Sequence, residues 1–187
     1  MPQKEIVTVC KNNLIDSKNI DFLHTETIPV SFPLGEQEKR VIRDLEDTAN
    51  NIDCAGIAAN QLGYNKKIFI GSFDGSFVIC INPRIKKYIE PSLLLPYDEN
   101  KRIKKDALAA NLEGCLSIPH YNFVIPRYNI IHVEYYDKMG KKINKQLKGT
   151  NAIIFQHETD HLSGFTIMNR FFDWYEEGQS NLFPMID

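Results

Sequence analysis

The chain has 187 residues, of which 43% are hydrophobic and 25% are charged, a balance that predicts one packed domain over residues 1–187. Its net charge of -2 gives no electrostatic reason to expect nucleic acid or an anionic membrane as the main partner. No apolar run approaches the roughly 20 residues that cross a bilayer, and the first residues lack the apolar stretch of a secretory signal. We therefore expect a cytoplasmic protein.

The first half of the chain predicts a helix followed by two strands. Residues 36–50 form an amphipathic pattern, because their apolar side chains share one stripe: Val41, Ile42, Leu45 and Ala49. Residues 66–73 and 76–83 are rich in β-branched and aromatic residues, and Asp74-Gly75 between them indicates a tight turn. Residues 88–110 contain prolines and a polar cluster, which predicts a surface loop or insertion.

The second half predicts a hairpin followed by a helix. Residues 129–147 alternate in polarity, and Lys138-Met139-Gly140 supplies a turn. Residues 149–162 fit a helix with Thr150 or Asn151 as its N-cap, and Gly164 stands where a glycine ends a helix. Because strands mostly precede this last helix, the predicted class is α+β.

The stretch QHETDHLSG, residues 156–164, contains the HExxH pattern. Four helical residues turn through about 400°, so His157 and His161 lie on one face and can bind one metal ion. Glu158 projects to the side, where it can take a proton from a water molecule on that ion. The alternative is an ordinary solvated helix face. The apolar residues 152–155 argue against it, because they predict a buried helix whose polar groups need partners.

Two histidines are an incomplete set, because catalytic metal sites usually have three protein ligands. An acid downstream would give a zincin-type peptidase, and the candidates are Asp173, Glu176 and Glu177. The stronger candidate is Cys115, which lies in the short segment EGCLSIP after Gly114, a residue that lets the backbone bend close to an ion.

Three stretches together resemble the peptide deformylase family: AGIAANQ at 55–61, EGCLS at 113–117 and QHETDHLSG at 156–164. They occur in the family's order, and the resemblance runs over most of the chain. The combination is more specific than HExxH alone. It implies an α+β fold in which antiparallel sheets pack around a central HExxH helix. It also implies a hydrolase that removes the formyl group from the N-terminal formyl-methionine of nascent polypeptides, with proximity to the ribosome as a further expectation.

The resemblance also assigns roles to residues. Cys115, His157 and His161 would hold one divalent metal ion, with ferrous iron as the physiological ion and zinc, nickel or cobalt as substitutes. Glu158 would be the general base and acid. The oxyanion would be stabilised by Gln61 and by the backbone N–H of Leu116.

Further roles concern the substrate and the neighbours of the ligands. Gly56 would lie beside the substrate backbone. An apolar pocket for the methionine side chain would be lined by Ile153 and Ile57, although a core role is favoured for Ile57. Glu113 or Asp160 is expected to pair with Arg127 and so hold the Cys115 segment against the helix.

Some positions depart from the family pattern. Cys54 stands at the first glycine of the usual Gly-x-Gly, and Asn122 stands where many bacterial members carry arginine. These departures leave three alternatives open: a diverged deformylase-like protein with weak or altered activity, the zincin-type metallopeptidase, and a non-hydrolytic protein that binds formylated or free N-termini.

Overall fold

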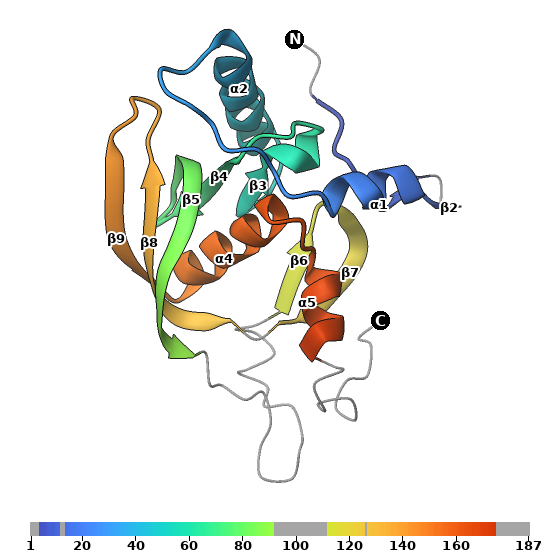
Figure 1. Ribbon diagram of the computed structural model, residues 1–187. Helices are drawn as coiled ribbons and strands as arrows, with labels where there is room; N and C mark the ends of the chain where they lie inside the picture. The colour runs from blue at the N-terminus through green and yellow to red at the C-terminus, as the bar shows by residue number, and fades with distance from the viewer. Residues whose placement is uncertain (1–3, 12–13, 92–111, 126, 175–187) are drawn as a thin grey trace.

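The computed structural model describes residues 4–11, 14–91, 112–125 and 127–174 (Figure 1). Its helices are α1 (Ser17–Leu23), α2 (Glu36–Asn51), the short 3-10 helix η1 (Ala59–Leu62), α4 (Thr150–Leu162) and α5 (Ile167–Trp174). Its strands are β1 (Cys10–Lys11), β2 (Leu14–Ile15), β3 (Gly56–Ala58), β4 (Ile68–Phe73), β5 (Ser76–Pro91), β6 (Leu112–Cys115), β7 (Ile118–Val124), β8 (Tyr128–Tyr136) and β9 (Lys142–Lys148). Over these described ranges, every helix is too short or too polar to cross a membrane.

The main sheet has five strands in the order β3-β4-β5-β8-β9, and every neighbouring pair is antiparallel. Two smaller antiparallel pairs, β1–β2 and β6–β7, lie outside it. Helices and antiparallel sheets therefore coexist, which confirms the predicted α+β class. Because β3 is at one end of the strand order, one of its edges is not covered by a strand of this sheet.

Helix α4 lies between the main sheet and the β6–β7 pair (Figure 1). It packs against the sheet through Phe155, which is fully buried and meets the Phe69 ring edge-on at a centroid distance of 5.2 Å. Ile154 packs over the backbone of Gly71, where an added Cβ would approach its methyl group to 3.2 Å. Burying a phenylalanine side chain stabilises the fold by about 1.5–3 kcal/mol, so these contacts hold α4 firmly on the sheet.

The helix predicted over 36–50 and both hairpins are confirmed as α2, β4–β5 and β8–β9. The prediction of a side-chain N-cap at Thr150 or Asn151 is wrong. The cap is Gly149, which makes no side-chain cap bond and has a φ of 58° that favours glycine. Asn151 instead bonds Asp74 in the β4–β5 turn, its Nδ2 donating to Oδ1 at 2.8 Å.

The prediction of a loop from residue 88 onward is wrong for residues 88–91, which belong to β5. Tyr88 is paired with Ile131 of β8, across a ladder interrupted by several register shifts. Pairing with a neighbouring strand overrides the local preference of a proline-containing segment. The rest of that prediction, residues 92–110, lies outside the described residues.

Candidate metal centre

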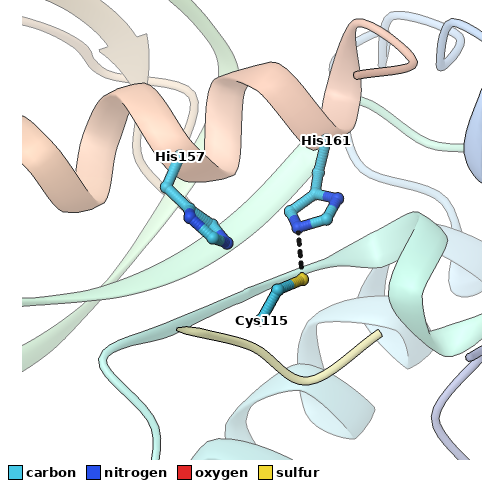
Figure 2. A group of neighbouring side chains, drawn as sticks. All are labelled: Cys115, His157 and His161. Carbon is cyan, nitrogen blue, oxygen red and sulfur yellow. Dashed lines mark hydrogen bonds between the residues drawn. The ribbon is translucent and has the colours of Figure 1, made fainter. Parts of the chain in front are cut away.

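His157 and His161 project from the same side of α4 toward Cys115 at the end of β6 (Figure 2). Cys115 Sγ lies 3.1 Å from His161 Nε2. One potential ligand atom from each of these side chains lies within 4.8 Å of the others. The structure thus brings together the residues that the sequence predicts as metal ligands.

The Cys115 segment is held by buried hydrogen bonds at the turn between β6 and β7. Ser117 is fully buried, and its Oγ accepts a hydrogen bond from Gln61 Nε2 at 3.2 Å. Its backbone carbonyl accepts from the Val9 N–H at 2.9 Å. Fixing the residue two positions after Cys115 limits where the sulfur can lie, which is what a preformed ligand position requires.

The electrostatics around Cys115 favour its thiolate. Burial alone would oppose ionisation, but the charge of His161 and hydrogen bonds to His157 and His161 lower the pKa of the Cys115 thiol well below its usual value. The thiolate is the form of cysteine that binds metal ions. One thiolate and two imidazoles match the donor sets of zinc and iron sites, and three protein ligands leave one coordination position open.

The ring of His157 is oriented by an acid on β6. His157 Nδ1 donates to Glu113 Oε2 at 2.9 Å. Arg127 Nε and Nη2 donate to the two oxygens of the same carboxylate, at 2.7 and 2.8 Å. Burial opposes ionisation of Glu113, yet Arg127 outweighs it and lowers the pKa of Glu113 to about 2. Because Nδ1 is occupied, the Nε2 atom of His157 is the one that can bind an ion.

His161 is positioned through its backbone. Asn60 Nδ2 donates to the His161 carbonyl at 2.6 Å, which ties η1 to the end of α4. The ring is almost fully buried, and Nδ1 has no hydrogen-bond partner among the described residues. Nε2 is the atom near Cys115, so both histidines present the same ring nitrogen to the site.

Glu158 is 3% exposed, and its Oε2 has no hydrogen-bond partner within the described ranges. Its other oxygen lies against Gly56, where an added Cβ would be 2.6 Å away. Burial, only partly offset by His157 and His161, raises the pKa of Glu158 to about 7. A carboxyl group with such a pKa is suited to accept and return a proton near neutral pH.

Gln61 is buried in η1, near Cys115. Its Oε1 accepts from the Ala58 N–H at 2.8 Å, which fixes the amide orientation. Its Nε2 therefore points to the site, 3.6 Å from Cys115 Sγ. A buried amide with a fixed N–H₂ group can meet negative charge that develops beside it.

The free edge of β3 borders the same region. The Ser72 N–H donates to the Ala55 carbonyl, so Ala55 and, by alternation, Ile57 direct their backbone groups toward β4. Gly56 lies between them and directs its N–H and C=O to the uncovered edge. An extended peptide can pair with such groups by adding a strand.

The other residues to which the sequence assigned roles differ in how deeply they are buried. The Ile57 side chain is fully buried in the core cluster of α2, β3 and β4, which agrees with the core role favoured for it. Ile153, on α4, is partly exposed, and Leu116 directly follows Cys115 and is also partly buried. A substrate contact of Ile153 and an oxyanion role of the Leu116 N–H stay predictions. The acids of the zincin hypothesis are not placed, because the Asp173 side chain and residues 176–177 lie outside the described part.

Two contacts of the site were missed by reasoning from the sequence. One is the bond from Asn60 to the His161 carbonyl, and the other is the pairing of Arg170 with Asp160. The first joins residues 101 positions apart, so no spacing rule points to it. The expected pairing of Arg127 is confirmed, and Arg127 contacts both Glu113 and Asp160.

Cys54 and Asn122, the two residues that depart from the family pattern, both lie among described residues of the structure. Cys54 is partly buried against the core cluster that contains Ile57. Burial, then the charges of Glu158 and Asp53, raise the pKa of the Cys54 thiol to about 11. Asn122 covers the backbone of Gly114, where an added Cβ would lie 2.7 Å from Asn122 Oδ1.

Comparisons with known proteins agree on one family. Residues 13–176 match the family model for polypeptide deformylase. Peptide deformylase 2 of Ralstonia nicotianae is 34% identical over 145 residues, which are 77% of this chain and 78% of that protein. The peptide deformylase of Aquifex aeolicus is 31% identical over 158 residues, covering 80% of each chain.

Solved structures give the same result. The crystal structure of peptide deformylase from Thermotoga maritima superimposes with a TM-score of 0.67 at 30% identity, covering 80% of this chain and 90% of that one. A Met-Ala-Ser-bound class I type b peptide deformylase from Acinetobacter baumannii shares the fold, with a TM-score of 0.67 at 24% identity over 80% of this chain and 92% of that one. On the family match and the identities, the chain belongs to the polypeptide deformylase family.

Proposed function

We propose that the chain is a peptide deformylase, a metal-dependent hydrolase that removes the formyl group from the N-terminal formyl-methionine of nascent polypeptides. One observation carries the proposal. The potential ligand atoms of Cys115, His157 and His161 lie within 4.8 Å of one another, and the buried carboxyl group of Glu158 interacts electrostatically with all three residues. The family relationship supports this activity and favours neither a zincin-type peptidase nor a diverged protein.

The metal proposal follows from the donor set. Cys115, His157 and His161 would hold one divalent ion, with ferrous iron as the physiological ion and zinc, nickel or cobalt as ions that fit the same donors. When bound, the ion supplies Lewis-acid chemistry, because it activates water at neutral pH and polarises the formyl oxygen. The fixed Glu113 contact to His157 supports this assignment, since ligating histidines usually give their second N–H to such a partner.

The protein's own groups account for the proton transfers. Glu158 accepts a proton as water adds to the formyl carbon. The C–N bond of the formamide then breaks, and the same proton passes from Glu158 to the leaving nitrogen. The resulting formic acid gives its own proton to the amine, so the products are formate and a peptide with a free, protonated α-amino group, and Glu158 is again ionised.

Segments next to the ligands would stabilise the oxyanion and orient the substrate. The Gln61 amide and the Leu116 N–H would donate hydrogen bonds to the oxyanion, and one such donor lowers the barrier by about 2.7–4 kcal/mol. The outward backbone groups of Gly56 would pair with the peptide backbone, which places the formyl group beside Glu158. Ile153, one helical turn before His157, would contact the methionine side chain.

The same proposal extends to the setting of the site. Residues 1–187 would form a single catalytic domain in which α4 is the central helix, enclosed by antiparallel sheets. Because formyl-methionine is present at the start of nascent chains, the protein would act in the cytoplasm and close to the ribosome. No nucleic-acid contact is required for this, since the substrate is the peptide terminus.

The test is deformylation of formyl-Met-Ala-Ser by ferrous-loaded protein under anaerobic conditions, with formate as the measured product. A tripeptide of this sequence without the formyl group is the ligand bound in the Acinetobacter baumannii structure. We expect the wild type to release formate. Glu158→Ala is expected to keep its metal and release none. Absence of formate from a wild type that carries one ion per chain would contradict the proposal.

Cys115→Ala separates the deformylase from the zincin hypothesis. We expect this variant to lose metal in the presence of a mild chelator, as His157→Ala does. A site completed by an acid near the C-terminus would instead keep its metal in Cys115→Ala. Metal content is measured after the chelator is removed, so the result does not depend on turnover.

A further inference from the structure

A row of alternating charges leads from the buried Glu113–Arg127 pair beside the metal centre to the partly exposed Arg170 on helix α5. Arg127 lies between two carboxylates, donating to both oxygens of Glu113 and, through Nη1, to Asp160 Oδ2 at 2.5 Å. On the other side of Asp160, Arg170 donates from Nε to Oδ2 at 2.9 Å and from Nη2 to Oδ1 at 2.5 Å. The two acids and the two arginines balance in charge, which offsets the cost of burying Glu113 and Arg127.

One end of this row contacts a candidate metal ligand, because Glu113 accepts from His157 Nδ1. Asp160 and Glu113 both form ion pairs with Arg127. Arg170 gives Asp160 a second cation in a fork-shaped contact, so that Arg127 keeps its own two-bond contact with Glu113. Arg170 is thus linked to the His157 ring through Asp160, Arg127 and Glu113.

Helix α5 also packs on the other half of the site. Ile167 is buried in a cluster with Cys115, Ile118 and Ile125, and Met168 and Phe171 pack against that cluster. Figure 1 shows α5 beside β6 and below the end of α4. The helix begins at a local capping contact, in which Thr166 N–H and Oγ1 both donate to Asn169 Oδ1 at 2.8 Å. Thus α5 contacts the strand of the thiolate ligand and, through Arg170, the helix of the histidine ligands.

We propose that Arg170 is a positioning residue for the metal site, which acts through Asp160, Arg127 and Glu113 on His157 and fixes α4 relative to the Cys115 strand. The proposal rests on the metal site inferred above but not on deformylation. It concerns how tightly and in what geometry an ion is held.

The experiment uses Co²⁺ as the probe, because its visible absorption bands and its thiolate charge-transfer band report coordination directly. Co²⁺ affinity is measured by competition with a chelator for wild type, Arg170→Ala and Arg170→Lys. We expect Arg170→Ala to bind Co²⁺ on the order of 10-fold more weakly, with shifted bands, at the low end of the range for residues that touch a ligand. Arg170→Lys restores the cation and is expected to recover most of the affinity.

The matched control is Lys138→Ala, which removes a surface ion pair with Glu46 of 2.7 Å between α2 and the β8–β9 turn. It should leave affinity and spectrum unchanged. If Arg170→Ala does not fold, Arg170→Gln, which keeps a donor without the charge, takes its place. An Arg170 variant with wild-type affinity and spectrum, even if less stable to heat, overturns the proposal and leaves the metal site intact. A wild type without a thiolate charge-transfer band would instead overturn the metal site itself.

Discussion

The backbone of Gly56 lies directly against the carboxyl group of Glu158, so closely that a Cβ at Gly56 would be 2.6 Å from Oε1 and 3.0 Å from Cδ. The same glycine directs its N–H and C=O to the uncovered edge of β3. One residue without a side chain thus brings the strand that would hold the substrate next to the group that would move the proton. A glycine is required here by close approach, and not by a left-handed φ.

Gly56→Ala is expected to lower kcat/KM by about 100-fold, because the added methyl group displaces the Glu158 carboxylate and misplacement of a catalytic group by about 1 Å has effects of that size. Metal content should be unchanged, since Glu158 is not a ligand. The measurement is formate release from formyl-Met-Ala-Ser together with metal analysis.

Gly35→Ala is the matched control for this substitution. A Cβ there would also meet a carboxylate oxygen, Glu38 Oε2 at 2.9 Å, but that pair lies at the start of α2. It should retain wild-type kcat/KM. If the two variants have equal kcat/KM, the close contact between Gly56 and Glu158 does not affect catalysis.

Gln61→Ala should reduce kcat by about 10²–10³ with a smaller change in KM, because a fixed donor to the oxyanion acts mainly in the transition state. Ser117→Ala removes only the hydroxyl that Gln61 Nε2 contacts at 3.2 Å and serves as the comparison. We expect a much smaller loss in that variant. If KM alone rises in Gln61→Ala, the side chain binds ground state and transition state equally.

Glu113→Gln should destabilise the metal-free protein at pH 7 by about 3 kcal/mol, because it removes the carboxylate that accepts two hydrogen bonds from the buried Arg127 and leaves Asp160 as its remaining acid in this row. The folded-state pKa of Glu113 is about 2, below the ordinary 4.5. The ionised group therefore stabilises the fold above about pH 4.5, and that contribution is lost as the pH falls toward 2. Urea unfolding of wild type and variant between pH 7 and 3 should show a difference in the free energy of unfolding that becomes smaller as the pH falls. If the difference in the free energy of unfolding is the same at every pH, the destabilisation comes from altered packing and not from the lost charge.

Cys54 should react with iodoacetamide slowly, because only the thiolate is nucleophilic and the Cys54 pKa is raised from 9.0 to about 11. The rate should rise about tenfold per pH unit until the pH approaches that pKa. Glu158→Gln should speed the reaction near pH 8, since it removes a negative charge beside the thiol. Mass spectrometry of the peptide that contains residue 54 gives the rate. A plateau near pH 9 would contradict the burial and charge of this position.

The sequence by itself determined the features that depend on local geometry. The spacing of His157 and His161 places both on one helix face whatever surrounds the helix. The apolar stripe of 36–50 and the alternation of 129–147 likewise follow from the periods of helix and strand. The segment around Cys115 made it the stronger of several candidates for the third ligand, and the resemblance assigned it that role. The structure brings its sulfur to 3.1 Å from His161.

Tertiary structure alone decided the features that depend on contacts between distant segments. The continuation of β5 through residues 88–91 requires pairing with β8, and the N-cap of α4 at Gly149 requires the turn that follows β9. The same holds for Asn60 on the His161 carbonyl and for Arg170 on Asp160. A hydrogen bond or ion pair between distant residues forms only where folding brings the two groups together. The sequence position of one partner therefore does not predict the other.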